Sequence, residues 1–182
     1  SRLEEMLKRA EDLSRESEEL LRRVLEEVKD LSRKHEEALR EILKRVKDLV
    51  DTVRDLLRRG KADEKVLRRI KEELRKLKEE AKRISDELED RLRKLKERID
   101  EILERLERRY RKLKKEIEDE LPETEEVRKL EEELKRLLEE NRRLAKELRD
   151  ELRRLTKRNK DVVREVERRL EEIMKEIDKE VR

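Results

Sequence analysis

The chain has 182 residues, of which 61% are charged and 32% hydrophobic, with 57 Lys or Arg, 54 Asp or Glu and a single His. It contains one Gly and one Pro, and it lacks Cys, Phe and Trp. This composition predicts long helices, and the lack of Cys excludes disulfides and thiolate metal sites. A net charge of +3 is too small to favour a charged, disordered chain.

An apolar stripe in the first segment advances in steps of four and three residues and repeats every 18 residues. Five turns in 18 residues correspond to about 3.6 residues per turn, the period of a straight α-helix, whereas 3.5 forces left-handed supercoiling. The pattern therefore predicts a long, nearly untwisted helix. Its stripe consists of Met6, Ala10, Leu13, Ser17, Leu20, Val24, Val28, Leu31, His35, Ala38, Ile42, Val46, Leu49, Val53 and Leu56.

Two short segments interrupt the helical pattern. Gly60 suits the left-handed position that follows a helix end, and Asp63 is a good cap for a second helix. Pro122 disfavours helix at the preceding residue, and Thr124 is the expected cap of a third helix. Ser1 has the spacing of a capping box with Glu4.

The expected fold is all-α. Short connections between helices of equal length make neighbours antiparallel, so we expect an up-down-up three-helix bundle within one chain. We treat residues 1–182 as a single domain. The predicted helices cover 2–59, 63–120 and 125–181, with turns at 60–62 and 121–124.

Each helix presents an apolar band about 100–140° wide, which suits contact with two other helices. On the first helix, Leu7, Leu25 and Leu43 widen the band, and a further helix could pack there. No run approaches the roughly 20 apolar residues of a membrane span, so no membrane interaction is expected.

Basic and acidic residues are interleaved in all three segments, and the excess of three positive charges lies in the middle one. No basic arm or stripe follows from this pattern, and Tyr110 is the one aromatic side chain that could stack on a base. The sequence therefore argues against nucleic acid as a partner.

Several polar residues interrupt the apolar stripes, and some recur at the 18-residue spacing. Folding at the two turns aligns positions of the first two helices whose numbers sum to about 123, and about 244 for the last two. Buried polar groups need partners, so we expect two hydrogen-bond networks, with His35 at the centre of the first. The first network comprises Ser32, His35, Ser85, Thr156 and Asn159, and the second comprises Ser14, Ser17, Asn141 and, about one turn away, Tyr110.

Catalysis would require His35 as a base and Ser32 or Ser85 as a nucleophile. The expected core offers no cleft, no oxyanion donor and no inward acid to orient the imidazole. A lone His without inward Cys, Asp or Glu is not a metal site either. We therefore expect no catalytic residue, no metal and no cofactor, and we interpret the networks as devices that set helix register.

These features resemble de novo designed helical bundles with buried hydrogen-bond networks, built on straight helices. The resemblance covers the whole chain and rests on the 18-residue repeat, the equal helices and the Leu, Ile and Val core. It implies a structural scaffold without natural biochemical activity, monomeric and requiring no partner. The alternative is an interaction module, one chain of a designed homo- or hetero-oligomer that binds a further helix. The sequence leaves cellular location open.

Overall fold

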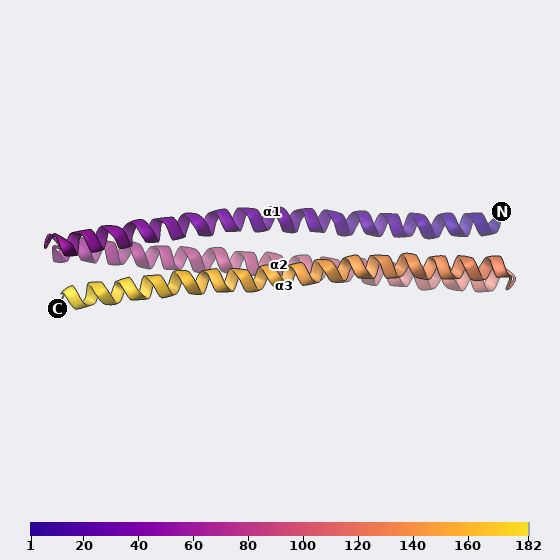
Figure 1. The fold of residues 1–182 in the computed structure, drawn as a ribbon. Helices are drawn as coiled ribbons and strands as arrows, with labels where there is room; N and C mark the ends of the chain where they lie inside the picture. Colours follow the sequence, from indigo (N-terminus) through magenta and orange to yellow (C-terminus); the bar gives the residue numbers. More distant parts are fainter. Residues whose placement is uncertain (182) are drawn as a thin grey trace. The chain divides into compact units, whose positions relative to one another are not determined.

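Three helices of 57 residues each make up almost all of the chain (Figure 1). The computed structural model describes the backbone of residues 1–181 and the side chains of residues 1–180. The helices are α1 (Arg2–Arg58), α2 (Glu64–Glu120) and α3 (Glu125–Val181). Residues 1–181 contain no strand, so this part of the chain is all-α.

Side-chain caps fix where the helices begin. The Ser1 hydroxyl, the Asp63 carboxylate and the Thr124 hydroxyl each accept a hydrogen bond from a backbone N–H two or three residues later, at 3.3, 3.3 and 3.2 Å. Each cap satisfies one of the backbone donors that a helix leaves unpaired in its first turn. The start of α2 thus lies one residue after the boundary expected from the sequence.

A glycine turn ends α1. Gly60 has φ of 68°, and its N–H donates to the Leu57 carbonyl at 3.2 Å. The Lys61 N–H donates to the Leu56 carbonyl at 3.1 Å. This pair of bonds is the Schellman motif, which requires a left-handed residue directly after the helix.

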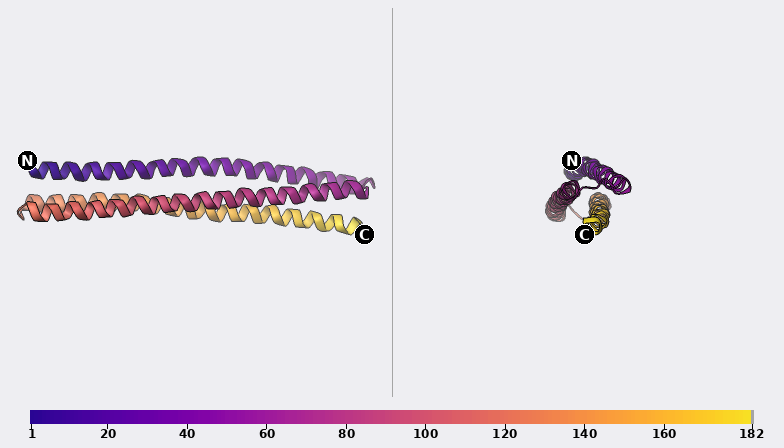
Figure 2. Two further views of the ribbon diagram at one scale, coloured as in Figure 1. Left: turned by 180° about the vertical axis from the view of Figure 1, so that it is seen from behind. Right: turned by 90° about the vertical axis from the view of Figure 1, so that its left-hand side faces the viewer.

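The chain divides into two compact units, each of which contains a segment of every helix. Unit 1 consists of Ser1–Lys29 and Leu92–Arg153, and unit 2 consists of Asp30–Arg91 and Arg154–Arg182. Within each unit the three segments lie side by side (Figure 1 and Figure 2). The single domain expected over 1–182 stays a prediction.

In unit 1, ion pairs between α1 and α2 show the relative direction of the two segments. Arg9 of α1 pairs with Glu116 of α2, and Glu27 of α1 pairs with Arg98 of α2. Partner numbers fall along α2 as they rise along α1, so the two segments are antiparallel. The core beneath them is aliphatic and includes Met6, Ala10, Leu113, Ile117, Val127, Leu130 and Leu134.

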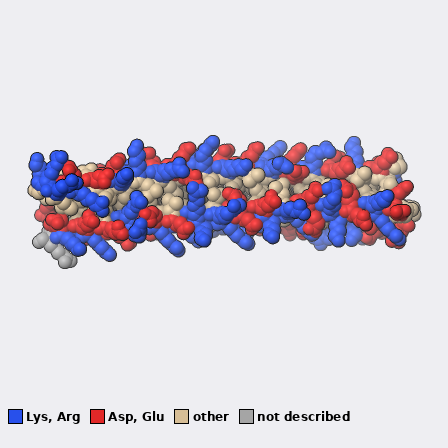
Figure 3. Space-filling model, viewed as in Figure 1, with Lys and Arg blue, Asp and Glu red and all other residues tan. Residues whose placement is uncertain are grey.

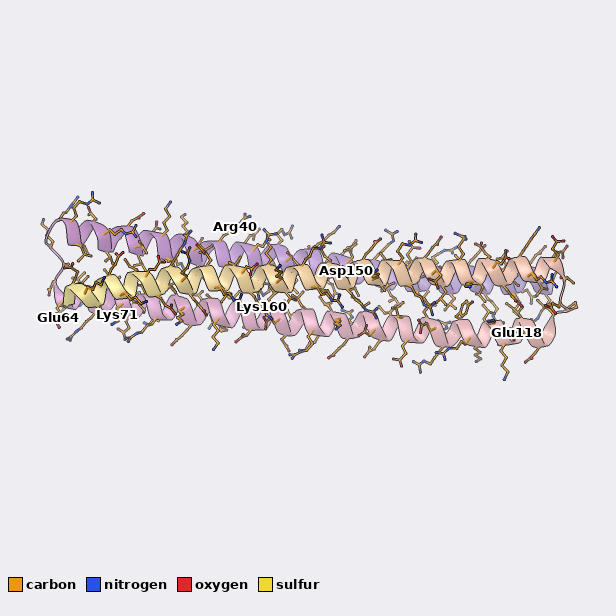
Figure 4. The ribbon with its side chains drawn as sticks, turned by 60° about the horizontal axis from the view of Figure 1, so that its bottom comes forward. Arg40, Glu64, Lys71, Glu118, Asp150 and Lys160 are labelled. Atoms are coloured by element: carbon orange, nitrogen blue, oxygen red, sulfur yellow. The ribbon has the colours of Figure 1, made fainter. Side chains whose placement is uncertain are left out.

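Unit 2 has the same construction. Arg45 of α1 pairs with Glu80 of α2, and Lys71 of α2, beside the last turns of α3, pairs with Asp178 (Figure 4). Burying one large aliphatic side chain contributes about 1.5–3 kcal/mol, so the shared core outweighs any surface pair. Its buried members are Ile42, Val46, Val53, Leu67, Ile70, Leu74, Leu77, Ala81, Val166, Leu170, Ile173 and Ile177.

We predict that Gly60→Ala destabilises the protein by about 1 kcal/mol, because a Cβ disfavours positive φ. Crowding does not contribute, since no atom lies within 4 Å of the position that a Cβ would occupy. Gly60→Asn should lose less, because Asn tolerates the left-handed region better than Ala. Equilibrium denaturation measures both. Equal stability of Gly60→Ala and the parent would contradict the backbone explanation.

Candidate functional site

In unit 1, a buried amide on α3 joins α1. The Asn141 Nδ2 donates to the Ser14 Oγ at 3.0 Å and to the Leu137 carbonyl at 3.1 Å. Ser14, Ser17 and Asn141 are buried. Tyr110 is only partly buried and packs against the aliphatic cluster of this unit. The structure thus brings together Ser14 and Asn141.

In unit 2, the corresponding amide joins α2 instead. The Asn159 Nδ2 donates to the Ser85 Oγ at 2.9 Å and to the Ser85 carbonyl at 3.3 Å. Both residues are buried, at 3% and 6% exposure. The pair connects α3 with α2 at the level that the alignment of the two turns predicts.

The other polar positions of unit 2 lie at the edge of the core. Ser32, His35 and Thr156 are partly exposed, so the complete burial expected for them from the sequence is corrected here. The His35 Nδ1 lies 2.9 Å from the Leu31 carbonyl of its own helix. This contact lies within α1 and His35 is half-buried, so the network expected around it stays a prediction.

The two asparagines occupy the same face of α3, because they lie 18 residues, or five full turns, apart. They nevertheless bond to different helices. The helix that carries the serine decides the partner: Ser14 is on α1 and Ser85 is on α2. An amide at this face therefore reaches either neighbour.

Both amides bury an acceptor that has no partner. The Asn141 Oδ1 and the Asn159 Oδ1 are buried without a hydrogen bond. Leaving a buried polar atom unpaired costs about 1–3 kcal/mol, whereas a made hydrogen bond contributes about 0.5–1.5 kcal/mol. The pairs are thus neutral or unfavourable for stability, and a gain in stability does not explain them.

A hollow opens beside the second pair, between α1 and α3 of unit 2. Its volume is about 170 Å³, and it is lined by Ser32, His35, Glu36, Leu39, Arg40, Leu43, Leu88, Leu155, Arg158, Asn159 and Val162. A core without a cleft was expected from the sequence, and this hollow corrects that expectation. Side chains from all three helices line it, and Leu39, Leu88 and Asn159 are its buried members.

On the face shown in Figure 3, Lys and Arg are mixed among Asp and Glu, and uncharged side chains are visible between them. Hydrogen bonds from Arg9 and Arg168 lower the pKa of Glu116 and Glu165, respectively, below the usual value. The Arg9–Glu116 bond measures 2.6 Å. Because these carboxylates lie at the surface and are only partly covered, water screens them and the pairs contribute little to stability.

Metal-ligating residues do not gather among the described residues. This part of the chain contains no group of three or more His, Cys, Asp or Glu that could hold a metal ion. None of the described helices combines the length and the apolar character that a membrane crossing needs.

Comparison with known proteins relates the fold to designed proteins. A solved structure described as a "Computationally designed three helix bundle" matches with a TM-score of 0.62, over 99% of this chain and 90% of that chain. The chain has the fold of a three-helix bundle. Sequence identity with that structure is 19%, so the likeness concerns the fold. No protein-family model and no curated protein matches the sequence.

Sequence reasoning missed two features of unit 2. One is the hollow, which depends on how side chains of all three helices fill the space between them, and no motif in the sequence signals it. The other is the ion pair between Arg158 and Glu36 at its rim, at 2.8 Å. Surface charges recur everywhere in this chain, so nothing in the sequence marked these two.

We predict opposite effects from removing one or both members of the Ser85–Asn159 pair. Ser85→Ala should cost about 1 kcal/mol, because the buried amide loses its closest acceptor. The double variant Ser85→Ala/Asn159→Leu should be at least as stable as the parent, since it removes the unpaired Oδ1 as well. Denaturant titration of a double-mutant cycle measures this, with Ser17→Ala as a buried-serine control. A double variant less stable than Ser85→Ala would contradict the conclusion that the pair is neutral or unfavourable for stability.

Proposed function

We propose that the chain is a designed structural scaffold without enzymatic activity, in which the two Asn–Ser pairs fix the axial register of the helices. The observation that carries the proposal is the repeated pairing of Asn141 with Ser14 and of Asn159 with Ser85, in a core whose only other buried polar residue among those described is Ser17. The 18-residue repeat, the equal helices and the absence of Phe and Trp are features typical of designed bundles.

The energetics favour a role in specificity. Aliphatic stripes alone discriminate poorly between correct and shifted alignments, because a helix shifted by one turn still meets Leu, Ile or Val on its neighbours. A shifted amide would lose its serine and bury a further polar group unpaired, at about 1–3 kcal/mol. The pairs would thus raise the free energy of wrong alignments more than they affect the right one.

A second role is that of one chain in a larger assembly. It is favoured by Leu7, Leu25 and Leu43, which recur at 18-residue spacing along α1 and are only partly buried. A further helix, from a second copy or from another chain, would cover this row. The scaffold proposal instead expects a monomer of 22.6 kDa.

We predict that each pair acts in its own unit. Ser14→Ala/Asn141→Leu should leave unit 2 with one sharp set of backbone amide NMR signals and give multiple or broadened signals in unit 1. Ser85→Ala/Asn159→Leu should have the reverse effect, so each double variant is the control for the other.

Light scattering after gel filtration supplies the second readout, with the parent expected at 22.6 kDa. Sharp, single signal sets in both double variants would overturn the register role. A parent mass at a multiple of the chain mass would replace the monomeric scaffold with the assembly.

A further inference from the structure

The hollow of unit 2 has an apolar interior. Leu39 and Leu88, both 4% exposed, belong to the core and form its floor. Leu43, Leu155 and Val162 line it and are partly buried. An apolar surface of this kind favours the ring of a small organic molecule over water.

The rim of the hollow carries one ion pair and one further Arg. The Arg158 Nη1 lies 2.8 Å from the Glu36 Oε1. Arg40 is exposed and extends outward from α1 (Figure 4). With Arg158 neutralised by Glu36, the rim offers little attraction to an aromatic carboxylate.

One polar group of the hollow can serve as an acceptor. Since a backbone carbonyl only accepts, the His35 nitrogen beside the Leu31 carbonyl carries the hydrogen, and in that tautomer the Nε2 accepts. Asn159 also lines the hollow, but its Nδ2 donates to Ser85 and its Oδ1 is itself buried. A matching ligand therefore needs a hydrogen-bond donor.

The volume sets the size of the ligand. An engineered apolar cavity of roughly 150 Å³ in another protein holds benzene, and this hollow measures about 170 Å³. We propose that it binds a monocyclic aromatic alcohol of the phenol class, with the ring against Leu39, Leu43, Leu155 and Val162 and the hydroxyl donating to the His35 Nε2.

Unit 1 supplies an internal comparison. A hollow of about 160 Å³ between α1 and α2 is lined by Ser17, which stands 18 residues before His35, and by Ile102. The Arg109–Glu16 ion pair, at 3.1 Å, involves two of its lining residues. Since it lacks an imidazole, it should not share the preference for phenol.

The test is a titration of the full chain with phenol, benzene and benzoate, followed by NMR. His35 is the single His and Tyr110 the single Tyr, so each gives one identifiable set of ring signals. Phenol should shift the His35 signal saturably, with a Kd on the order of 1 mM, and should leave Tyr110 of unit 1 unchanged. Benzene should bind about five-fold more weakly, because it does not donate to Nε2. Benzoate should not bind, because its carboxylate only accepts and would lose its hydration beside the Nε2 acceptor.

Variants separate the acceptor from the cavity. His35→Leu should remove the preference for phenol over benzene, read from ligand saturation-transfer signals. Val162→Phe should abolish binding of both by filling the hollow, whereas Ile102→Phe in unit 1 should not. Leu43→Phe, at a partly exposed position, repeats the filling test if Val162→Phe proves unfolded by circular dichroism.

Several results would overturn the proposal. One is the absence of saturation at tens of millimolar phenol, about ten-fold above the expected Kd. Others are equal affinity for phenol and benzene in the parent, or full phenol binding by the folded Val162→Phe or Leu43→Phe variant. A parent mass twice that of the chain, with the His35 signal shifting on dilution, would show that a second copy covers the hollow instead.

Discussion

The structure depends on the burial of three apolar stripes that no helix can hide by itself. An isolated helix keeps one face of Leu, Ile and Val in water, and its stability comes chiefly from tertiary packing of that face. In each unit, segments of α1, α2 and α3 supply side chains to one aliphatic core. The short turn at Gly60 reverses the chain direction, so that α2 returns along α1. The charged exterior keeps the remaining faces solvated and adds little binding energy of its own.

Burying polar groups in such a core lowers the stability of the fold. The two asparagines therefore favour one alignment of the helices at some cost in stability. Asn141 and Asn159 each make good donor contacts yet bury an unpaired oxygen. Two aliphatic side chains would fill the same volume without that cost. The two asparagines increase the free-energy difference between the aligned bundle and its shifted alternatives. With aliphatic stripes alone this difference would be small.

Local chemistry made much of the fold predictable from the sequence. Gly60 and Thr124 mark their helix ends because turn and cap chemistry is local, and Ser85 and Asn159 share a level because equal helices fold back at short turns. The helix to which each asparagine bonds was not predictable. The 18-residue spacing puts Asn141 and Asn159 on the same face of α3, and the alignment at the turns gives only the level along the helices. The placement of His35 and the hollow that it lines depend on side-chain rotamers and summed volumes across three helices. The near absence of supercoiling, expected from the 18-residue period, stays a prediction.

Native-state hydrogen exchange tests the shared burial most directly. Inward amides of all three segments in a unit, such as those of Ala10, Ile117 and Leu134 in unit 1, should exchange through one common opening with the highest free energies in that unit. The account is contradicted if the inward amides of one helix exchange orders of magnitude faster than those of the other two, because that helix would then not depend on the core it is said to share.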